Sequence, residues 1–111
     1  MKKISFVVFI LFQLIFAGNA IASTYTGKVS AISVRDEDGL VWISIQGERT
    51  GNRPTCATHW YMVIKNENSS AGKRQLAMLM MAKATNRPVV IDGAGTCSRW
   101  SNGEDISTIS M

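Results

Sequence analysis

Residues 68–91, NSSAGKRQLAMLMMAKATNRPVVI, decide the fold of this chain because they place a helix directly before a strand. Residues 68–70, Asn-Ser-Ser, are types that cap helix N-termini. Ala71 to Thr85 consists mainly of strong helix formers. Residues 86–88, Asn-Arg-Pro, end the helix, since the residue before a proline avoids the helical region. The apolar run at 89–91 then predicts a short strand.

Outward from this stretch, the chain predicts three strands before the helix and a last strand after the one at 89–91. β-branched and small residues mark the first strand, and an Asp-Gly pair at 38–39 indicates a hairpin after it. A helix between the third and fourth strands is the layout of the OB-fold, a partly open Greek-key barrel. We therefore expect a mainly β domain with one helix, a five-stranded OB-fold barrel in the order β-β-β-α-β-β. The expected strands are Tyr25–Val34, Leu40–Gln46, Cys56–Ile64, Val89–Ile91 and Asp105–Ser110.

Side-chain alternation assigns the tryptophans of the second and third strands to different environments. Val41, Ile43 and Ile45 share one face of the second strand, so Trp42 lies on the opposite face, exposed or in an interface. Trp60 shares a face with Cys56, Met62 and Ile64 in the third strand, and this composition predicts burial.

The expected helix carries apolar residues all round its circumference. Leu76, Met80 and Ala84 lie on one side, whereas Met78 and Ala82 lie on the far side. Two interpretations remain open. Either the helix is imperfectly amphipathic, or it buries one face on its own barrel and a second face on neighbouring subunits.

Residues 1–22 have the three-part plan of a secretory signal peptide. Lys2 and Lys3 precede the apolar run Ile4–Phe16, and Ala20-Ile21-Ala22 provides small residues for cleavage after Ala22. The apolar run is shorter than the ~20 residues that a spanning helix needs. We therefore expect a secreted or periplasmic protein whose single binding domain comprises residues 23–111.

The mature segment is small and weakly charged. Removing 22 of 111 residues leaves 89, and removing two lysines leaves 10 basic residues against 8 acidic ones. The basic residues are scattered and form no stripe, which argues against nucleic acid as a partner. Cys56 and Cys97 are the only cysteines, so in an oxidising compartment we expect one disulfide. It would close a loop of about 40 residues and stabilise the fold by ~3–4 kcal/mol.

No set of residues converges on catalysis. His59 is the only histidine, and it lies in an expected strand beside two aromatic residues. The acidic residues 36–38 lack the ligand spacing of a calcium loop, so they predict a solvated turn. Glu104-Asp105 is interpreted as a similar surface pair. We therefore expect no enzyme activity, no metal and no cofactor.

Most of the mature chain resembles the small secreted proteins related to the B subunit of subtilase cytotoxin, a group akin in fold to pertussis-like toxin B subunits. The resemblance rests on Cys56-Ala57-Thr58, Trp60, Gly72, the helix Leu76–Ala84, Val89–Ile91 and Gly93–Trp100. It implies an OB-fold with one disulfide, a ring-shaped homopentamer, binding of sialylated host glycans and, as a possible partner, an enzymatic A subunit.

The resemblance also suggests a binding site near the mature N-terminus. In that family a serine in an aromatic-Ser-Gly-x-Val run contacts the sialic acid, and the corresponding run here is residues 25–29, Tyr-Thr-Gly-Lys-Val. Thr26 keeps the hydroxyl but adds a methyl group. Lys28 alternates to the same side and is expected to attract a carboxylate, with Arg35 a weaker candidate. Tyr25 or Trp42 is expected to stack on the sugar ring.

Two functions from different classes remain open at this point. The first is a non-catalytic glycan-binding module like a toxin B subunit. The second is a periplasmic protein-binding module, such as a lysozyme inhibitor or an envelope-stress factor.

Overall fold

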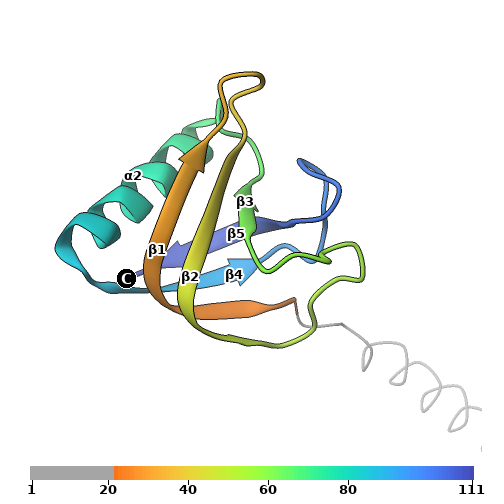
Figure 1. Ribbon diagram of the computed structural model, residues 1–111, viewed down its shortest axis with the longest axis horizontal. Helices are drawn as coiled ribbons and strands as arrows, with labels where there is room; N and C mark the ends of the chain where they lie inside the picture. The colour runs from red at the N-terminus through yellow and green to blue at the C-terminus, as the bar shows by residue number, and fades with distance from the viewer. Residues whose placement is uncertain (1–21) are drawn as a thin grey trace, which may run out of the picture.

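The computed structural model describes residues 22–111, which form a closed five-stranded barrel with one helix against it (Figure 1). Of the expected signal peptide only Ala22 belongs to this part of the chain, so that prediction lies outside the described residues. Within residues 22–111, no helix has the length and apolar character needed to cross a membrane.

The order of the strands round the barrel defines the fold. Neighbouring strands follow the order β1-β2-β3-β5-β4, and β4 pairs with β1 to close the ring. The contact between β3 and β5 is parallel, and the helix lies between β3 and β4 in the chain. This is the OB-fold arrangement, so the predicted architecture is confirmed. The elements are β1 (Thr24–Val34), β2 (Val41–Thr50), β3 (Met62–Ile64), α2 (Ser70–Thr85), β4 (Pro88–Gly93) and β5 (Glu104–Ser110).

Two glycines face each other where the long hairpin of β1 and β2 bends round the barrel. Gly27 pairs with Gly47. A Cβ atom on Gly27 would lie 2.3 Å from the carbonyl oxygen of Gln46, and one on Gly47 would lie 1.9 Å from that of Thr26. Because neither position has room for a side chain, the two strands approach closely here. On its other edge, β1 pairs with β4 through residues 24–28.

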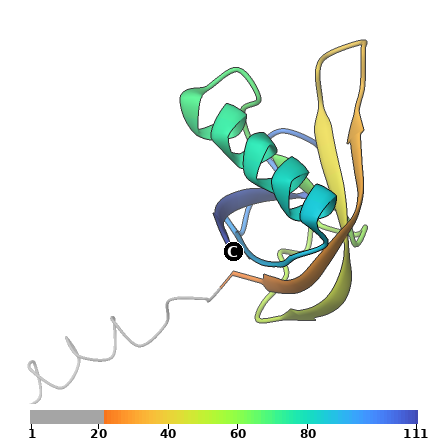
Figure 2. The ribbon, with the colours of Figure 1, turned by 90° about the vertical axis from the view of Figure 1, so that its left-hand side faces the viewer.

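An aliphatic core fills the barrel, and α2 covers one side of it (Figure 2). Leu79 and Ala82 are fully buried, and Met78 packs against the core. The side of the helix that carries Met78 and Ala82 therefore packs on the barrel of its own chain. Leu79 and Ala82 face the barrel core, and Gly72 packs against the backbone of Asn66 before the helix. The side that faces outward carries Met80 and Met81, each 57% exposed.

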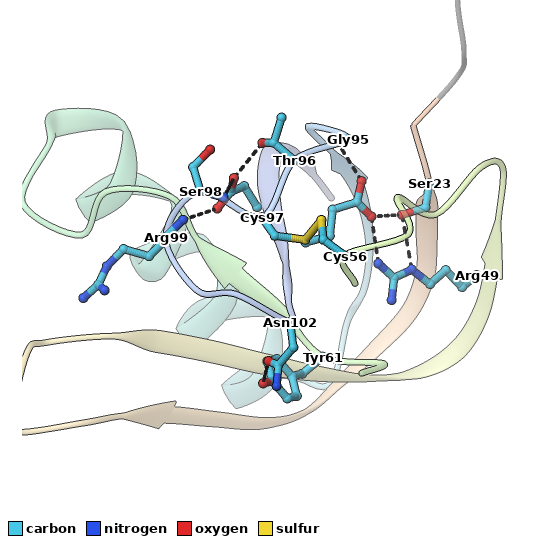
Figure 3. The surroundings of a disulfide bond; sticks show 12 residues. Ser23, Arg49, Cys56, Tyr61, Gly95, Thr96, Cys97, Ser98, Arg99 and Asn102 are labelled. Atoms are coloured by element: carbon cyan, nitrogen blue, oxygen red, sulfur yellow. Dashed lines mark hydrogen bonds and ion pairs between the residues drawn. A yellow bond between two sulfur atoms is a disulfide. The ribbon is translucent and has the colours of Figure 1, made fainter. Parts of the chain in front are cut away.

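The predicted disulfide is confirmed. Cys56 and Cys97 are bonded, with their Cα atoms 6.2 Å apart, and they join the loop before β3 to the loop between β4 and β5 (Figure 3).

The third strand is shorter than expected, since it begins only at Met62. The preceding backbone is held by other partners: Arg49 Nη1 donates to the Trp60 carbonyl at 3.1 Å, and the His59 amide donates to the Asn102 carbonyl at 3.2 Å. Trp60 therefore lies in a loop. Its side chain is 56% exposed, and the prediction that it is buried is wrong.

Candidate functional site

The four residues expected to bind a ligand do not form one site. Thr26 pairs with Glu48 and Val90, whereas Trp42 pairs with Ser33 at the other end of the hairpin. Ser33 lies seven positions after Thr26 along β1, which corresponds to ~23 Å at about 3.3 Å per residue. The structure therefore divides the expected site between two surfaces.

The first surface, which we call the Thr26 hollow, lies over β1, β4 and the end of β5. Thr26 and Lys28 are both exposed on β1, as alternation predicts. Glu48 lies directly across from Thr26 on β2 and is also exposed. Sequence reasoning missed Glu48, because its position depends on the register shift between Val29 and Ala31. The hollow has a volume of about 310 Å³ and is lined by Thr26, Pro88, Val89, Val90, Ser110 and Met111.

Tyr25 belongs to the core and not to either surface. Its side chain is only 9% exposed, and its ring packs with the aliphatic residues of the barrel. The guanidinium carbon of Arg49 lies 5.6 Å from the ring centroid, in a cation–π arrangement. Little of this ring is available to stack on a sugar.

The second surface, which we call the aromatic pocket, contains Trp42. It has a volume of about 240 Å³, and its walls come from the β1–β2 turn, β2, the residue before β3 and the β4–β5 loop. Three aromatic side chains therefore meet at one place, each of them half-buried. The lining residues are Arg35, Leu40, Trp42, Tyr61 and Trp100.

Arg35 forms the charged wall of the aromatic pocket. Its guanidinium carbon lies 4.4 Å from the centroid of the Trp100 ring. The same guanidinium donates to both carboxylate oxygens of Asp38, at 3.0 and 2.6 Å. These hydrogen bonds, together with one from the Leu40 amide, hold the pKa of Asp38 well below its usual value. Residues 36–38 form an exposed turn, as predicted, and Asp38 holds the guanidinium of Arg35 beside the pocket.

Arg99 connects the β4–β5 loop to the β1–β2 turn. Its side chain donates to both oxygens of Glu67, at 3.1 and 2.9 Å, and to the backbone carbonyl of Asp38 at 3.0 Å. The hydrogen bonds from Arg99 lower the pKa of Glu67. This bridge fixes the side of the loop that carries Trp100.

Asp105 holds the same loop from the inside. Its carboxylate is fully buried and accepts hydrogen bonds from the Thr96 hydroxyl at 2.6 Å, the Ser98 amide at 2.8 Å and the Arg99 amide at 3.1 Å (Figure 3). A buried carboxylate needs such donors to offset its desolvation. The loop is therefore folded round Asp105, and the Trp100 ring that it carries is held in place before a ligand binds.

Glu104 is also fully buried and anchors the other side of the disulfide. It forms an ion pair with Arg49, at 2.7 Å, and accepts from the Ser23 hydroxyl and from the Gly95 amide (Figure 3). The prediction that Glu104 and Asp105 form a surface pair is wrong. Ser23 and Arg49, which satisfy Glu104, lie far away in the sequence, and the donors to Asp105 meet it only once the β4–β5 loop has folded. Residue type alone therefore gives no signal of this burial.

Tyr61 is fixed by contacts on several sides. Its hydroxyl is hydrogen-bonded to the side-chain oxygen of Asn102, and His59 stacks on its ring with centroids 5.4 Å apart. A Cβ atom on Gly103 would lie 2.7 Å from the Tyr61 ring, so only glycine allows the ring this position. His59 thus acts as a packing partner of the aromatic pocket.

These two surfaces are suited to binding through hydroxyl groups, cations and flat rings. Among residues 22–111, no group of three or more histidine, cysteine, aspartate or glutamate side chains is placed to hold a metal ion. Comparison of the chain with protein-family models gives no match, and comparison with curated proteins gives no significant match. The protein is therefore classed by its fold, as a small disulfide-linked OB-fold barrel.

Proposed function

We propose that this protein is a secreted, non-catalytic glycan-binding module and that a sialylated sugar binds in the Thr26 hollow. The observation that carries the proposal is the exposure of the Thr26 hydroxyl and the Lys28 ammonium group on one side of β1. A hydroxyl both donates and accepts hydrogen bonds, and an ammonium group attracts a carboxylate. The sugar class comes from the resemblance to toxin B subunits, and the OB-fold barrel with one disulfide is compatible with it.

The surroundings of Thr26 supply the other contacts that a sugar needs. Val90 and Met111 are partly exposed apolar side chains in the hollow, so they offer contact to the apolar face of a pyranose. The Glu48 carboxylate accepts hydrogen bonds from sugar hydroxyls across the strand pair. Lys28 pairs with Pro88, which lines the hollow, and therefore lies at its margin.

A glycan array probed with residues 23–111 tests the proposal, followed by titration of the best sialylated ligand. Thr26→Val keeps the side-chain shape and removes the hydroxyl. A hydrogen bond to a charged group contributes about 1.5–3 kcal/mol, so the affinity should fall at least about tenfold. Thr58→Val makes the same change at an exposed threonine outside the hollow and should leave the affinity unchanged. Equal affinities of the two variants would contradict the site.

Self-assembly, with a homopentamer as the number implied by the resemblance, is part of the proposal. The outward side of α2 carries Met80 and Met81, with Ala77 and Ala84 exposed beside them. A second copy of the chain would bury this apolar stripe, and an enzymatic A subunit would bind to the resulting ring. Light scattering coupled to size exclusion should show an oligomer for the wild type and a monomer for the double variant Met80→Lys/Met81→Lys. A monodisperse wild-type monomer at tens of micromolar would contradict assembly.

A protein-binding module is the alternative, and the charge of α2 is the observation that favours it. Lys73, Arg74 and Lys83 are the only charged residues of the helix, so its exposed side combines methionines with positive charge alone. Such a surface fits a partner that is apolar and acidic. Under this alternative no glycan binds on the array. The protein forms a complex with a periplasmic partner instead, and the double variant Lys73→Glu/Lys83→Glu abolishes this complex. Binding of a sialylated glycan that this double change leaves intact would favour the first function.

A further inference from the structure

We propose that the aromatic pocket is a second ligand site and that it binds a neutral pyranose ring. It lies at the opposite end of the β1–β2 hairpin from the Thr26 hollow, because Trp42 pairs with Ser33 and Thr26 with Glu48. The site is thus separate from the proposed sialic-acid site and does not depend on it.

The distribution of aromatic residues is the first argument. The chain contains three tryptophans and two tyrosines, and its four phenylalanines all lie within residues 1–22. Among residues 22–111, Tyr25 is the only aromatic residue in the core, which is otherwise aliphatic. Trp42, Tyr61 and Trp100 gather instead at one half-buried pocket on the surface. Because the barrel packs without these rings, their convergence is typical of a binding site lined by aromatic side chains.

The polar groups at the pocket suit sugar hydroxyls. Arg35 uses Nε and Nη2 to hold Asp38, and its Nη1 forms no hydrogen bond with any described residue. This nitrogen is a donor for a ring or hydroxyl oxygen. The Tyr61 hydroxyl donates to the Asn102 side-chain oxygen, so the lone pairs of its phenolic oxygen are left to accept from a sugar hydroxyl. The aromatic rings would contact the apolar face of a pyranose, and these donors and acceptors would bind the hydroxyl groups at its edge.

The charges around the pocket favour a neutral ligand. Arg35 is paired with Asp38 at 2.6 Å, and Arg99 is paired with Glu67 at 2.9 Å. These two cations and two anions cancel, so the pocket offers no net positive field to a carboxylate. An acidic sugar would also have to compete with Asp38 for Arg35. The Thr26 hollow differs, since Lys28 forms no ion pair among the described residues.

The pocket is formed before a ligand arrives. The Asp105 carboxylate fixes the backbone of the loop that carries Trp100, and Arg99 joins this loop to the β1–β2 turn at the Asp38 carbonyl. Binding therefore requires little ordering of side chains, which reduces its entropic cost. The volume of about 240 Å³ is below the ~300–1,000 Å³ of drug-sized pockets. It is suited to a single ring at the end of a glycan.

Tryptophan fluorescence, confirmed by calorimetry, tests the proposal on residues 23–111. The probes are the methyl pyranosides of glucose, galactose, mannose and N-acetylglucosamine, with the methyl glycoside of sialic acid for comparison. At least one neutral pyranoside should give a saturable change that the sialic acid glycoside does not compete away. Trp100→Ala should weaken this binding at least about tenfold, as truncation of an anchoring ring typically does. Trp60→Ala is the matched control, because Trp60 does not line the pocket and contacts it only through the edge of Tyr61, so it should alter the affinity far less.

Two further variants keep the outcome decisive. Arg35→Gln changes a residue of a surface turn, so this variant should fold even if Trp100→Ala does not. It should lower the affinity for the neutral pyranoside at least about threefold. Thr26→Val should leave the affinity for the neutral pyranoside unchanged and lower the affinity for a sialylated ligand. Absence of binding to all four neutral pyranosides, or equal losses in Trp100→Ala and Trp60→Ala, would overturn the proposal. Neither result would affect the Thr26 hollow.

Discussion

Two groups of charged side chains hold the loop between β4 and β5, and they differ in their exposure to water. The buried group consists of Asp105 and of Glu104 with its partner Arg49. The surface group consists of Asp38 and Glu67 with Arg35 and Arg99, whose side chains are between 15% and 33% exposed. Both groups contain short ion pairs, so distance alone does not distinguish them.

Burial decides what each group contributes. Exposed ion pairs gain about 0–1 kcal/mol, because water and salt screen them. A buried carboxylate that loses its partner stays desolvated, which makes removal of one member costly. We therefore expect the buried group to determine whether the loop folds, and the surface group to adjust its position beside the aromatic pocket.

Arg49→Met should have the largest effect on stability. It leaves the fully buried Glu104 without its cation and also removes donors to the Ser23 hydroxyl and the Trp60 carbonyl. Breaking a buried pair from one side typically costs about 3–5 kcal/mol, so the free energy of unfolding in urea should fall by that amount. Arg53→Met is the matched control at an exposed arginine of the following loop.

A double variant separates an uncompensated charge from a simple loss of contacts. Glu104→Gln removes the charge but keeps the shape, so Arg49→Met/Glu104→Gln should be more stable than Arg49→Met alone. Strictly additive losses would show that charge burial does not govern this group.

Asp105→Asn should have the next largest effect. Two of the three donors reach one carboxylate oxygen, from Thr96 and Ser98, and the third reaches the other oxygen from Arg99. An amide cannot accept at both ends, so at least one buried donor loses its partner, at a cost of about 1–3 kcal/mol. Hydrogen exchange should show faster exchange of the Ser98 and Arg99 amides. Protection equal to that of the wild type would contradict a role of Asp105 in holding the loop.

The elements of the fold were predictable from local patterns, whereas the buried charges were not. The helix and the strand after it follow from residue types within 68–91, and the disulfide follows from the presence of two cysteines. Burial of Glu104 depends on Ser23 and Arg49, which lie 81 and 55 residues away. No periodicity encodes such a contact, because the barrel must close before these residues meet.

The aromatic pocket was missed for a related reason. Side-chain alternation places Trp42 correctly on the face opposite the apolar row. Trp60 was expected in a strand and therefore predicted to be buried, although it is exposed. Alternation is informative only where a strand forms, and residues 56–61 form a loop that the disulfide and Arg49 hold.

Ser69→Ala should have a smaller effect than the changes in the buried group. The Ser69 hydroxyl accepts a hydrogen bond from the Gly72 amide at 3.0 Å and caps α2. Loss of such a cap typically costs about 1 kcal/mol, which provides a scale for one neutral hydrogen bond near the surface. Ser70→Ala removes a hydroxyl from the first helical residue and should leave the thermal midpoint nearly unchanged. Equal shifts in the two variants would contradict the assignment of Ser69 as the cap.

The surface ion pairs should have the smallest effect, and pH distinguishes them from the buried group. The pKa of Asp38 is lowered by hydrogen bonds from Arg35, and the pKa of Glu67 by those from Arg99. A carboxylate with a lowered folded-state pKa stabilises the fold above its unfolded pKa of about 4, and this contribution is lost as the pH falls through the folded value. Asp38→Asn and Glu67→Gln should therefore lower the thermal midpoint slightly at pH 7 and match the wild type near pH 1. Salt at about 1 M should reduce the difference at pH 7, because exposed charges are screened over about 3 Å at that ionic strength. A difference that persists unchanged in acid would mean that these two carboxylates act by packing and not by charge.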